Sequence, residues 1–157
     1  MAQEDERFMR RAIAKAKQGM LEGQSPFGAC IAKRGRAVAC EHNMVRESCD
    51  STAHAEIHAI RAACRRLKSI DLSGCTIYST TEPCPMCFAA IHWARISRIV
   101  YGASISDAKR AGFNELAIPN AKMRSLAKSR LKIEEGVLAG ESRELFRVWK
   151  KYGGTPY

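Results

Sequence analysis

A histidine, a glutamate and two cysteines stand at the spacings of a metal site with an acid–base group beside it. One residue separates His54 from Glu56, Cys84 follows Glu56 by 28 positions, and Cys87 comes three positions later. One imidazole and two thiolates are ligands that Zn²⁺ prefers, and they leave its fourth tetrahedral position to water. Glu56 is not needed as a ligand and can carry protons. The spacing therefore predicts a catalytic site with one Zn²⁺ per chain.

The ligand His54 and the carboxylate of Glu56 must reach one pocket from one helix. Residues two positions apart on a helix point about 200° away from each other, so they share a pocket only at a helix end that points into it. The apolar spacing predicts a helix over residues 53–67, with Thr52 as its N-cap. Both side chains are then expected in the first turn.

The two cysteines are expected at the start of a second helix, over residues 85–94. Pro85 suits the first turn of a helix, which places Cys84 at the N-cap and Cys87 one turn in. The positive end of the helix dipole favours thiolate over thiol. This position therefore prepares both sulfur atoms for metal binding.

Other functions explain the same residues less completely. The sequence Cys84-Pro-x-Cys87 is similar to the redox motif of glutaredoxin-like proteins, but that motif follows the first strand and has no His-x-Glu upstream. A structural zinc site needs a fourth protein ligand, and none is suitably spaced. His54 and His58 have the spacing of the two histidines of a zincin motif, but that motif has its glutamate directly after the first histidine, whereas Glu56 comes one position later. His58 is therefore left out of the site. A non-catalytic zinc module would not need Glu56.

Length and composition predict one domain, residues 1–157. The chain is 46% hydrophobic and long enough to bury a core. Its first residues do not have the basic and then apolar order of a secretion signal, and no apolar segment approaches membrane-spanning length. We therefore expect no membrane contact. Seven cysteines, an odd number, do not predict a disulfide framework, and a reducing cytoplasm is the expected compartment. The cysteines expected to be small buried core residues are Cys30, Cys40, Cys49, Cys64 and Cys75.

The net charge of +10 favours phosphate-bearing partners such as RNA. Basic residues occur along the whole chain, and the densest run without an acid lies within residues 122–132. A solvated basic face is the preferred interpretation of such a run. A nucleic acid partner therefore stays the second choice.

The periodicity of apolar residues predicts alternating helices and strands. The predicted strands are residues 27–32, 36–40, 76–80, 96–101 and 131–134, and the predicted helices are residues 5–21, 53–67, 85–94, 107–111 and 141–152. Gly35 predicts a hairpin between the first two strands, and the helix between the third and fourth strands predicts a parallel pair. The expected fold class is α/β, a three-layer α/β/α sandwich with a five-stranded mixed sheet.

Five segments together resemble the cytidine deaminase superfamily, specifically its purine-acting branch. They are Pro26-Phe27-Gly28-Ala29, His42-Asn43, Thr52-Ala53-His54-Ala55-Glu56, Glu82-Pro83-Cys84-Pro85-Met86-Cys87 and His92-Trp93-Ala94-Arg95. The H-x-E…P-C-x-x-C pattern is the signature of zinc nucleobase deaminases. Trp93, the sequence Ala111-Gly112-Phe113 and a chain ending in Tyr157 make bacterial guanine deaminases the most similar group.

The resemblance implies roles for individual residues and a cytidine deaminase-like fold. His54, Cys84 and Cys87 would hold zinc, and Glu56 would be the catalytic proton carrier. The implied substrate-binding residues are Phe27, Asn43, Ala55, Trp93, Glu115 and Tyr157, with Ala55 acting through its main-chain N–H and Tyr157 closing the site. The resemblance also implies a homodimer and a small-molecule purine substrate.

The expected reaction is zinc-dependent hydrolytic deamination, with guanine giving xanthine and ammonia. Many guanine deaminases have Gly-Phe-Asp-Asp where this chain has Gly112-Phe113-Asn114-Glu115, so the acid is retained but is one methylene longer. A tRNA-specific adenosine deaminase, which forms inosine in an anticodon loop, is the main alternative. Deaminases of guanosine or of another aminated heterocycle are further alternatives.

Overall fold

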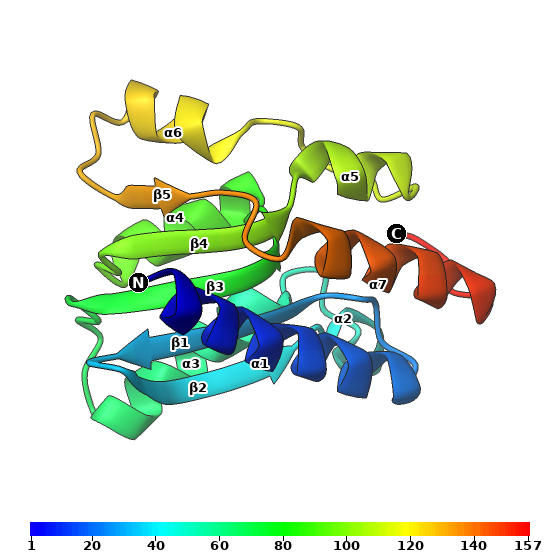
Figure 1. Cartoon of the computed structure of the whole chain (residues 1–157), viewed down its shortest axis with the longest axis horizontal. Helices are drawn as coiled ribbons and strands as arrows, with labels where there is room; N and C mark the ends of the chain where they lie inside the picture. The colour runs from blue at the N-terminus through cyan, green and yellow to red at the C-terminus, as the bar shows by residue number, and fades with distance from the viewer.

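A computed structural model of residues 1–157 has three layers, with one sheet between two layers of helices (Figure 1). The strands are β1 (Gly28–Lys33), β2 (Arg36–His42), β3 (Cys75–Thr81), β4 (Arg98–Ala103) and β5 (Lys132–Glu134). The helices are α1 (Ala2–Leu21), α2 (Val45–Ser48), α3 (Ala55–Leu67), α4 (Pro85–Trp93), α5 (Ile105–Arg110), α6 (Asn120–Leu126) and α7 (Ala139–Lys151). The predicted α/β sandwich is confirmed.

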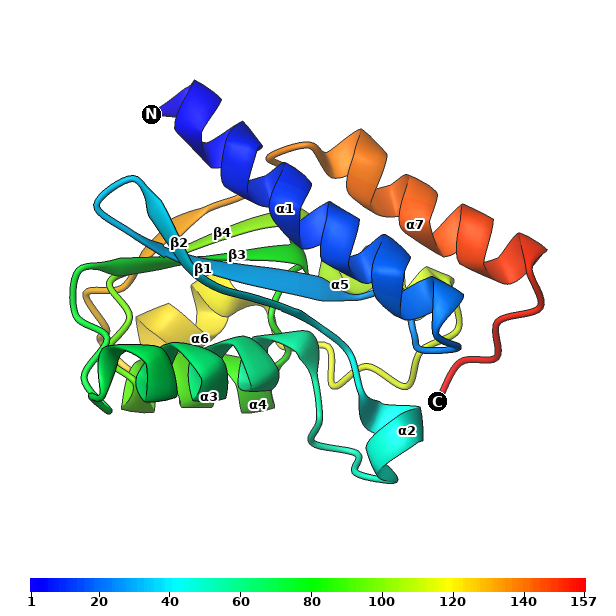
Figure 2. The same cartoon turned by 90° about the horizontal axis from the view of Figure 1, so that it is seen from below.

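The sheet has the strand order β2-β1-β3-β4-β5 and is mixed, as predicted. Strand β1 pairs antiparallel with β2 and β3, whereas β3, β4 and β5 run parallel. Helices α1 and α7 cover one face, and α3, α4 and α6 cover the other (Figure 2). The starts of α3 and α4 follow β2 and β3 in the chain, and both helices begin at the same end of the sheet (Figure 2).

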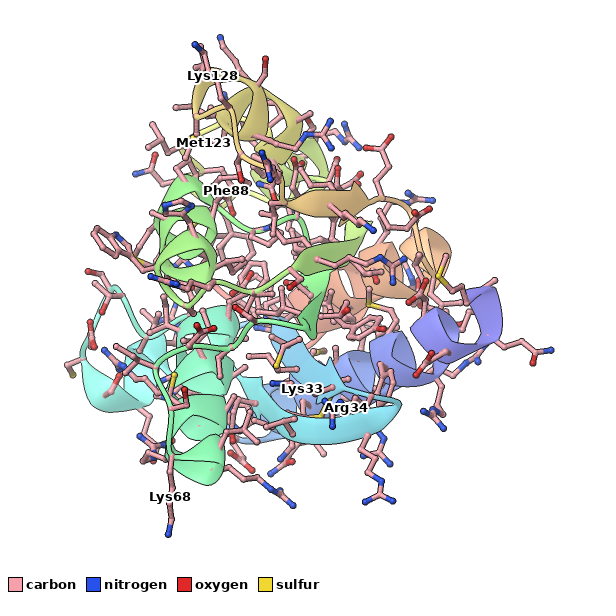
Figure 3. All side chains as sticks on the ribbon, turned by 90° about the vertical axis from the view of Figure 1, so that its left-hand side faces the viewer. Lys33, Arg34, Lys68, Phe88, Met123 and Lys128 are labelled. Atoms are coloured by element: carbon pink, nitrogen blue, oxygen red, sulfur yellow. A yellow bond between two sulfur atoms is a disulfide. The ribbon has the colours of Figure 1, made fainter.

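Two helices were not predicted, and several predicted boundaries differ from the observed ones by up to three residues. The sequence predicted neither α2 nor α6, and β4 begins at Arg98 rather than at residue 96. Helix α6 has only seven residues, so its apolar periodicity is too short to detect. Met123 of α6 packs on the same core as Phe88 of α4, and Figure 3 shows these two side chains between the helices. Tertiary packing therefore specifies this helix.

Two predictions about the cysteines were wrong: that Cys30 and Cys40 are simply small core residues, and that Cys49 is buried. Cys30 and Cys40 face each other across the β1–β2 ladder and form a disulfide, and Cys49 is exposed. Directly opposed positions of an antiparallel pair bring Cβ atoms close enough for such a bond. The odd cysteine count conveyed no register between strands, so the sequence could not reveal the pairing. Cys75 is buried, as predicted.

Basic side chains are distributed over the surface. Figure 3 shows Lys33 and Arg34 at the β1–β2 turn, Lys68 at the end of α3, where it points outward, and Lys128 beyond α6. Basic side chains on three different elements agree with the interpretation of a solvated basic surface. No helix of the structure combines the length and the apolarity needed to cross a membrane.

A buried ion pair attaches α1 to the sheet. Arg98 donates two hydrogen bonds to the carboxylate of Asp5, at 2.7 and 2.8 Å, and the Tyr78 hydroxyl donates a third at 3.0 Å. Burial alone would raise the pKa of Asp5, but the hydrogen bonds from Arg98 and Tyr78 lower it below its ordinary value of 3.8. Asp5 therefore stabilises the fold above that value, and this contribution is lost as pH falls through the lower folded-state pKa.

We expect Arg98→Met to lower the free energy of unfolding by about 3 kcal/mol at neutral pH, because it leaves a buried carboxylate without its cation. Urea unfolding measures the change. Arg10→Met is the matched control, since Arg10 pairs with Glu6 on the exposed side of α1 and such pairs contribute at most about 1 kcal/mol. If the free energy of unfolding fell equally in the two variants, the predicted contribution of the Asp5–Arg98 ion pair would be wrong.

Candidate active site

His54 and Glu56 lie at the start of α3, as their spacing required. His54 is itself the N-cap, with an extended backbone, and Glu56 lies in the first turn. The predicted capping role of Thr52 was wrong, because its hydroxyl donates to Asp50 at 2.7 Å instead. The helix therefore begins two residues later than expected, and its cap is a metal-ligand candidate.

Cys84 and Cys87 lie at the start of α4 in the predicted positions. Cys84 is the N-cap and Pro85 occupies the first turn. Cys87 is fully buried, whereas Cys84 is partly exposed. In the absence of metal, a hydrogen bond with Cys87 lowers the pKa of Cys84 to about 4. At least one of the two sulfurs is therefore a thiolate at neutral pH.

The three predicted ligand atoms are close enough to share one ion. His54 Nδ1 lies 3.7 Å from Cys84 Sγ and 3.5 Å from Cys87 Sγ, and the three ligand atoms lie within 4.8 Å of one another. A tetrahedral zinc with ordinary bond lengths requires N···S separations of about 3.6 Å. No fourth histidine, cysteine or carboxylate joins the group. The residues therefore fit a zinc ion with one open position, as in catalytic sites.

Glu56 is buried beside the ligands and is held in one orientation. The Ser79 hydroxyl, from β3, donates to Glu56 Oε1 at 2.9 Å. Oε2 lies 3.6 Å from Cys87 Sγ, on the ligand side. Burial raises the pKa of Glu56 above its ordinary value, as is typical of carboxylates that act as general acids and bases.

A pocket of about 290 Å³ opens in front of these groups. Its lining includes the predicted residues Phe27, His54, Glu56, Cys84, Glu115 and Tyr157. Asn43 is buried behind Tyr157, and Ala55 is the buried first residue of α3. Trp93 does not line the pocket, contrary to the expectation, because it stands at the far end of α4 and is 82% exposed. The structure therefore brings together every predicted site residue except Trp93.

The C-terminal tail closes one side of the pocket. Asn43 Nδ2 donates to the Tyr157 hydroxyl at 2.8 Å, and the Tyr157 ring packs edge-on against Phe113 at 5.5 Å. The Tyr157 carbonyl also accepts from the Asn114 N–H at 2.9 Å. Gly112 has φ +103°, and a Cβ there would lie 2.9 Å from Pro156, so this glycine lets the tail approach. Phe113 and Tyr157 thus form one wall of the pocket, and Asn43 supports Tyr157 from behind.

Comparison with known proteins decides the family. A protein-family model with the description "Cytidine and deoxycytidylate deaminase zinc-binding region" matches residues 2–103, which is more than half of the chain. The chain belongs to this family of zinc deaminases. Its match spans both helix starts that carry the ligands of this deaminase.

Relatives of the deaminase include enzymes with two kinds of substrate. It is 46% identical to a guanine deaminase of Bacillus subtilis, over 70% of this chain and 71% of the relative. It is 42% identical to a tRNA-specific adenosine deaminase of Aquifex aeolicus, over 76% and 80% of the two chains. A solved guanine deaminase from Nitrosomonas europaea has TM-score 0.86 and 28% identity, over 93% of this chain and 84% of that one.

Several residues of the deaminase site were missed by the sequence reasoning. Ser79 is an ordinary strand residue, and nothing in the sequence connects it with Glu56. Glu82 accepts the main-chain N–H groups of Ile105 and Asn120, at 3.1 and 2.8 Å, and so joins α5 and α6 to the cysteine loop. Asn120 in turn donates to the carbonyl of Pro83 at 2.6 Å. These bonds hold the segment that carries Glu115 against the metal site.

Proposed function

We propose that this deaminase acts on a free purine base, guanine above all, and releases xanthine and ammonia. The observation that carries the proposal is a carboxylate, Glu115, in a small pocket that Tyr157 closes. Guanine presents an amino group beside a ring N–H, and a carboxylate can accept both hydrogens as a pair. Adenine lacks that pair of adjacent donors, so it would leave Glu115 poorly satisfied at a cost.

The electrostatics around Glu115 suit a group that meets a polar ligand. Burial is the main cause that raises its pKa to about 7, and the negative charges of Cys84 and Glu56 add to the effect. A ligand that donates hydrogen bonds favours the ionised carboxylate. The donor edge of guanine would therefore stabilise the charge that burial disfavours.

The size and the lid of the pocket support a free base over an RNA strand. A volume of about 290 Å³ lies at the small end of ligand pockets. Arg46 donates to the carbonyl of Thr155, Asn43 donates to the Tyr157 hydroxyl, and the Asn114 N–H donates to the Tyr157 carbonyl, so three hydrogen bonds attach the tail. A strand of RNA would have to displace this tail to deliver a base.

The chain's own groups can carry out the hydrolysis. When bound, zinc supplies the acidity that brings a water molecule to a pKa of roughly 7. Glu56 takes a proton from the attacking water and delivers it to the ring nitrogen beside the amino-bearing carbon. The water oxygen bonds to that carbon, Glu56 passes the second proton to the amino group, and the C–N bond breaks. Water and the aminated base thus become ammonia and the keto base.

Deamination of adenosine in tRNA is the second candidate. The relative from Aquifex aeolicus and the net charge of +10 favour it. The lid formed by Tyr157 and the acid at position 115 argue against it. We further propose a homodimer, because a second copy would cover the exposed Trp93. Light scattering on the purified protein tests the dimer.

We expect the wild-type protein to release ammonia from guanine and to form no inosine in an anticodon stem-loop. Removal of Tyr157 should raise KM for guanine about tenfold, because the pocket loses its lid and the hydroxyl that faces Asn43. Parallel assays of both substrates measure this. Tyr152→Phe is the control, since Tyr152 is an exposed tyrosine at the end of α7. Activity on the stem-loop alone, unchanged by loss of the tail, would establish the tRNA candidate instead.

A further inference from the structure

The ring of His42 connects helix α1 to Asn43. His42 ends β2 and is buried, with only 7% of its surface exposed. Its Nδ1 lies 2.9 Å from the main-chain oxygen of Asn43, and its Nε2 lies 3.0 Å from Glu22 Oε2. A carbonyl oxygen only accepts, so Nδ1 carries the hydrogen of the first bond. The ring therefore donates toward Asn43 and is held from behind by Glu22.

Helix α1 supplies both supports of this ring. Glu22 caps the C-terminus of α1, and its other oxygen accepts from Gln18 at 3.0 Å. That hydrogen bond and the nearby His42 lower the pKa of Glu22, so it faces the ring as a carboxylate. A Cβ on Gly19 would lie 2.8 Å from the His42 ring, so the α1 backbone rests directly on the imidazole. The ring has little room to rotate.

Asn43 is fixed on every side except one. Only 1% of its surface is exposed, and its N–H donates to the carbonyl of Phe27 at 3.1 Å. Its side-chain oxygen accepts from the Val45 N–H at 3.1 Å, and its carbonyl faces His42. The side-chain amide donates one hydrogen to Tyr157. An amide nitrogen has two hydrogens, and the second has no acceptor in the protein.

We propose that His42, held by Glu22 and packed on Gly19, is a positioning residue that aims the Asn43 amide into the substrate pocket. This inference rests on the proposed function and on the substrate-binding role that the family resemblance implies for Asn43. Loss of the His42 donor leaves a buried carbonyl unpaired, and the Asn43 peptide can then rotate to find another partner. Such a rotation moves the amide by a fraction of an ångström at a contact that needs close alignment.

Two conservative variants separate the two bonds of the ring. Asparagine at position 42 keeps a donor at the δ position, toward Asn43, whereas glutamine places its donor at the ε position, toward Glu22. We expect His42→Gln and His42→Ala to raise KM about tenfold with kcat within about threefold of wild type. His42→Asn should stay within about threefold in KM. A tenfold change equals about 1.4 kcal/mol, the scale of one net hydrogen bond.

A double-mutant cycle distinguishes positioning from general damage. In an Asn43→Ala background, His42→Ala should change KM no further, because its effect passes through the missing amide. Glu6→Gln, which weakens an exposed ion pair on the same helix α1, is the control and should leave KM unchanged. Additive effects in the cycle, or a wild-type KM for a folded, zinc-loaded His42→Ala protein, would overturn the proposal.

A measurement without substrate keeps this test separate from the proposed function. The ¹⁵N-labelled side-chain amide of Asn43 should shift in His42→Ala and Glu22→Gln, and not in Glu6→Gln. The kinetics use whichever of guanine and the anticodon stem-loop the wild-type protein converts. If it converts neither, the proposed function fails and the amide signal still decides the role of His42. If His42→Ala does not fold, Gly19→Ala provides the same displacement of the ring, and an unmoved amide in that variant would contradict the proposal.

Discussion

The Glu56→Gln variant is expected to retain its zinc and its fold, while kcat falls about 10²–10⁴-fold. This is the range attributed to general acid–base groups. The amide preserves the shape of the side chain and still accepts from Ser79, so the local structure should not change. It cannot take a proton from water or carry one to the amino group. Steady-state kinetics beside zinc analysis and circular dichroism measure the effect.

Two further variants define how that result is interpreted. Glu6→Gln, on the exposed side of α1, should behave as wild type. Ser79→Ala should retain Glu56 as a proton carrier but lose its orientation, so a fall of about tenfold is expected, the scale of one hydrogen bond. A zinc-loaded Glu56→Gln protein that deaminates near the wild-type rate would remove Glu56 from the mechanism.

The metal site could be predicted because its determinants are local in the sequence. Pro85 and the short Cys84–Cys87 spacing specify a helix start and place two sulfurs on it. The same reasoning required a helix end at His54, and the structure has one there. It misplaced only the cap, because Thr52 bonds to Asp50 in the preceding loop. Such local competition between capping partners is not resolved by residue type alone.

Features that depend on contacts distant in the sequence could not be predicted. The Asn43–Tyr157 hydrogen bond joins residues 114 positions apart, and family resemblance named both residues without joining them. Ser79 faces Glu56 only because β3 lies beneath the start of α3. The side-chain direction of Trp93 depends on where α4 ends, and the helix turns it outward instead of toward the pocket. The register of the strands, the ends of the helices and the path of the C-terminal tail all depend on how the whole chain packs.

Cys87→Ser is expected to abolish stoichiometric zinc binding and to lower activity by more than about 10²-fold, because one of only three protein ligands is lost. A serine hydroxyl is nearly the same size as the thiol but stays protonated at neutral pH, so it gives zinc no anionic ligand. Cys87 is buried beside His54 Nδ1, and the metal-ligand group contains no fourth histidine, cysteine or carboxylate.

The same substitution should also lower stability, because zinc that binds only the folded chain stabilises it. With free zinc at 100 times its dissociation constant, that stabilisation is about 2.7 kcal/mol, and it should disappear from the variant. Cys49→Ser is the matched control, since Cys49 is exposed on the surface, and it should keep zinc, activity and stability. Zinc analysis after dialysis and thermal unfolding with and without a chelator measure both effects. One zinc per chain in active Cys87→Ser protein would mean that the Cys87 thiolate is not a ligand, and the catalytic site would then have to be built on His54 and Cys84 with a different third group.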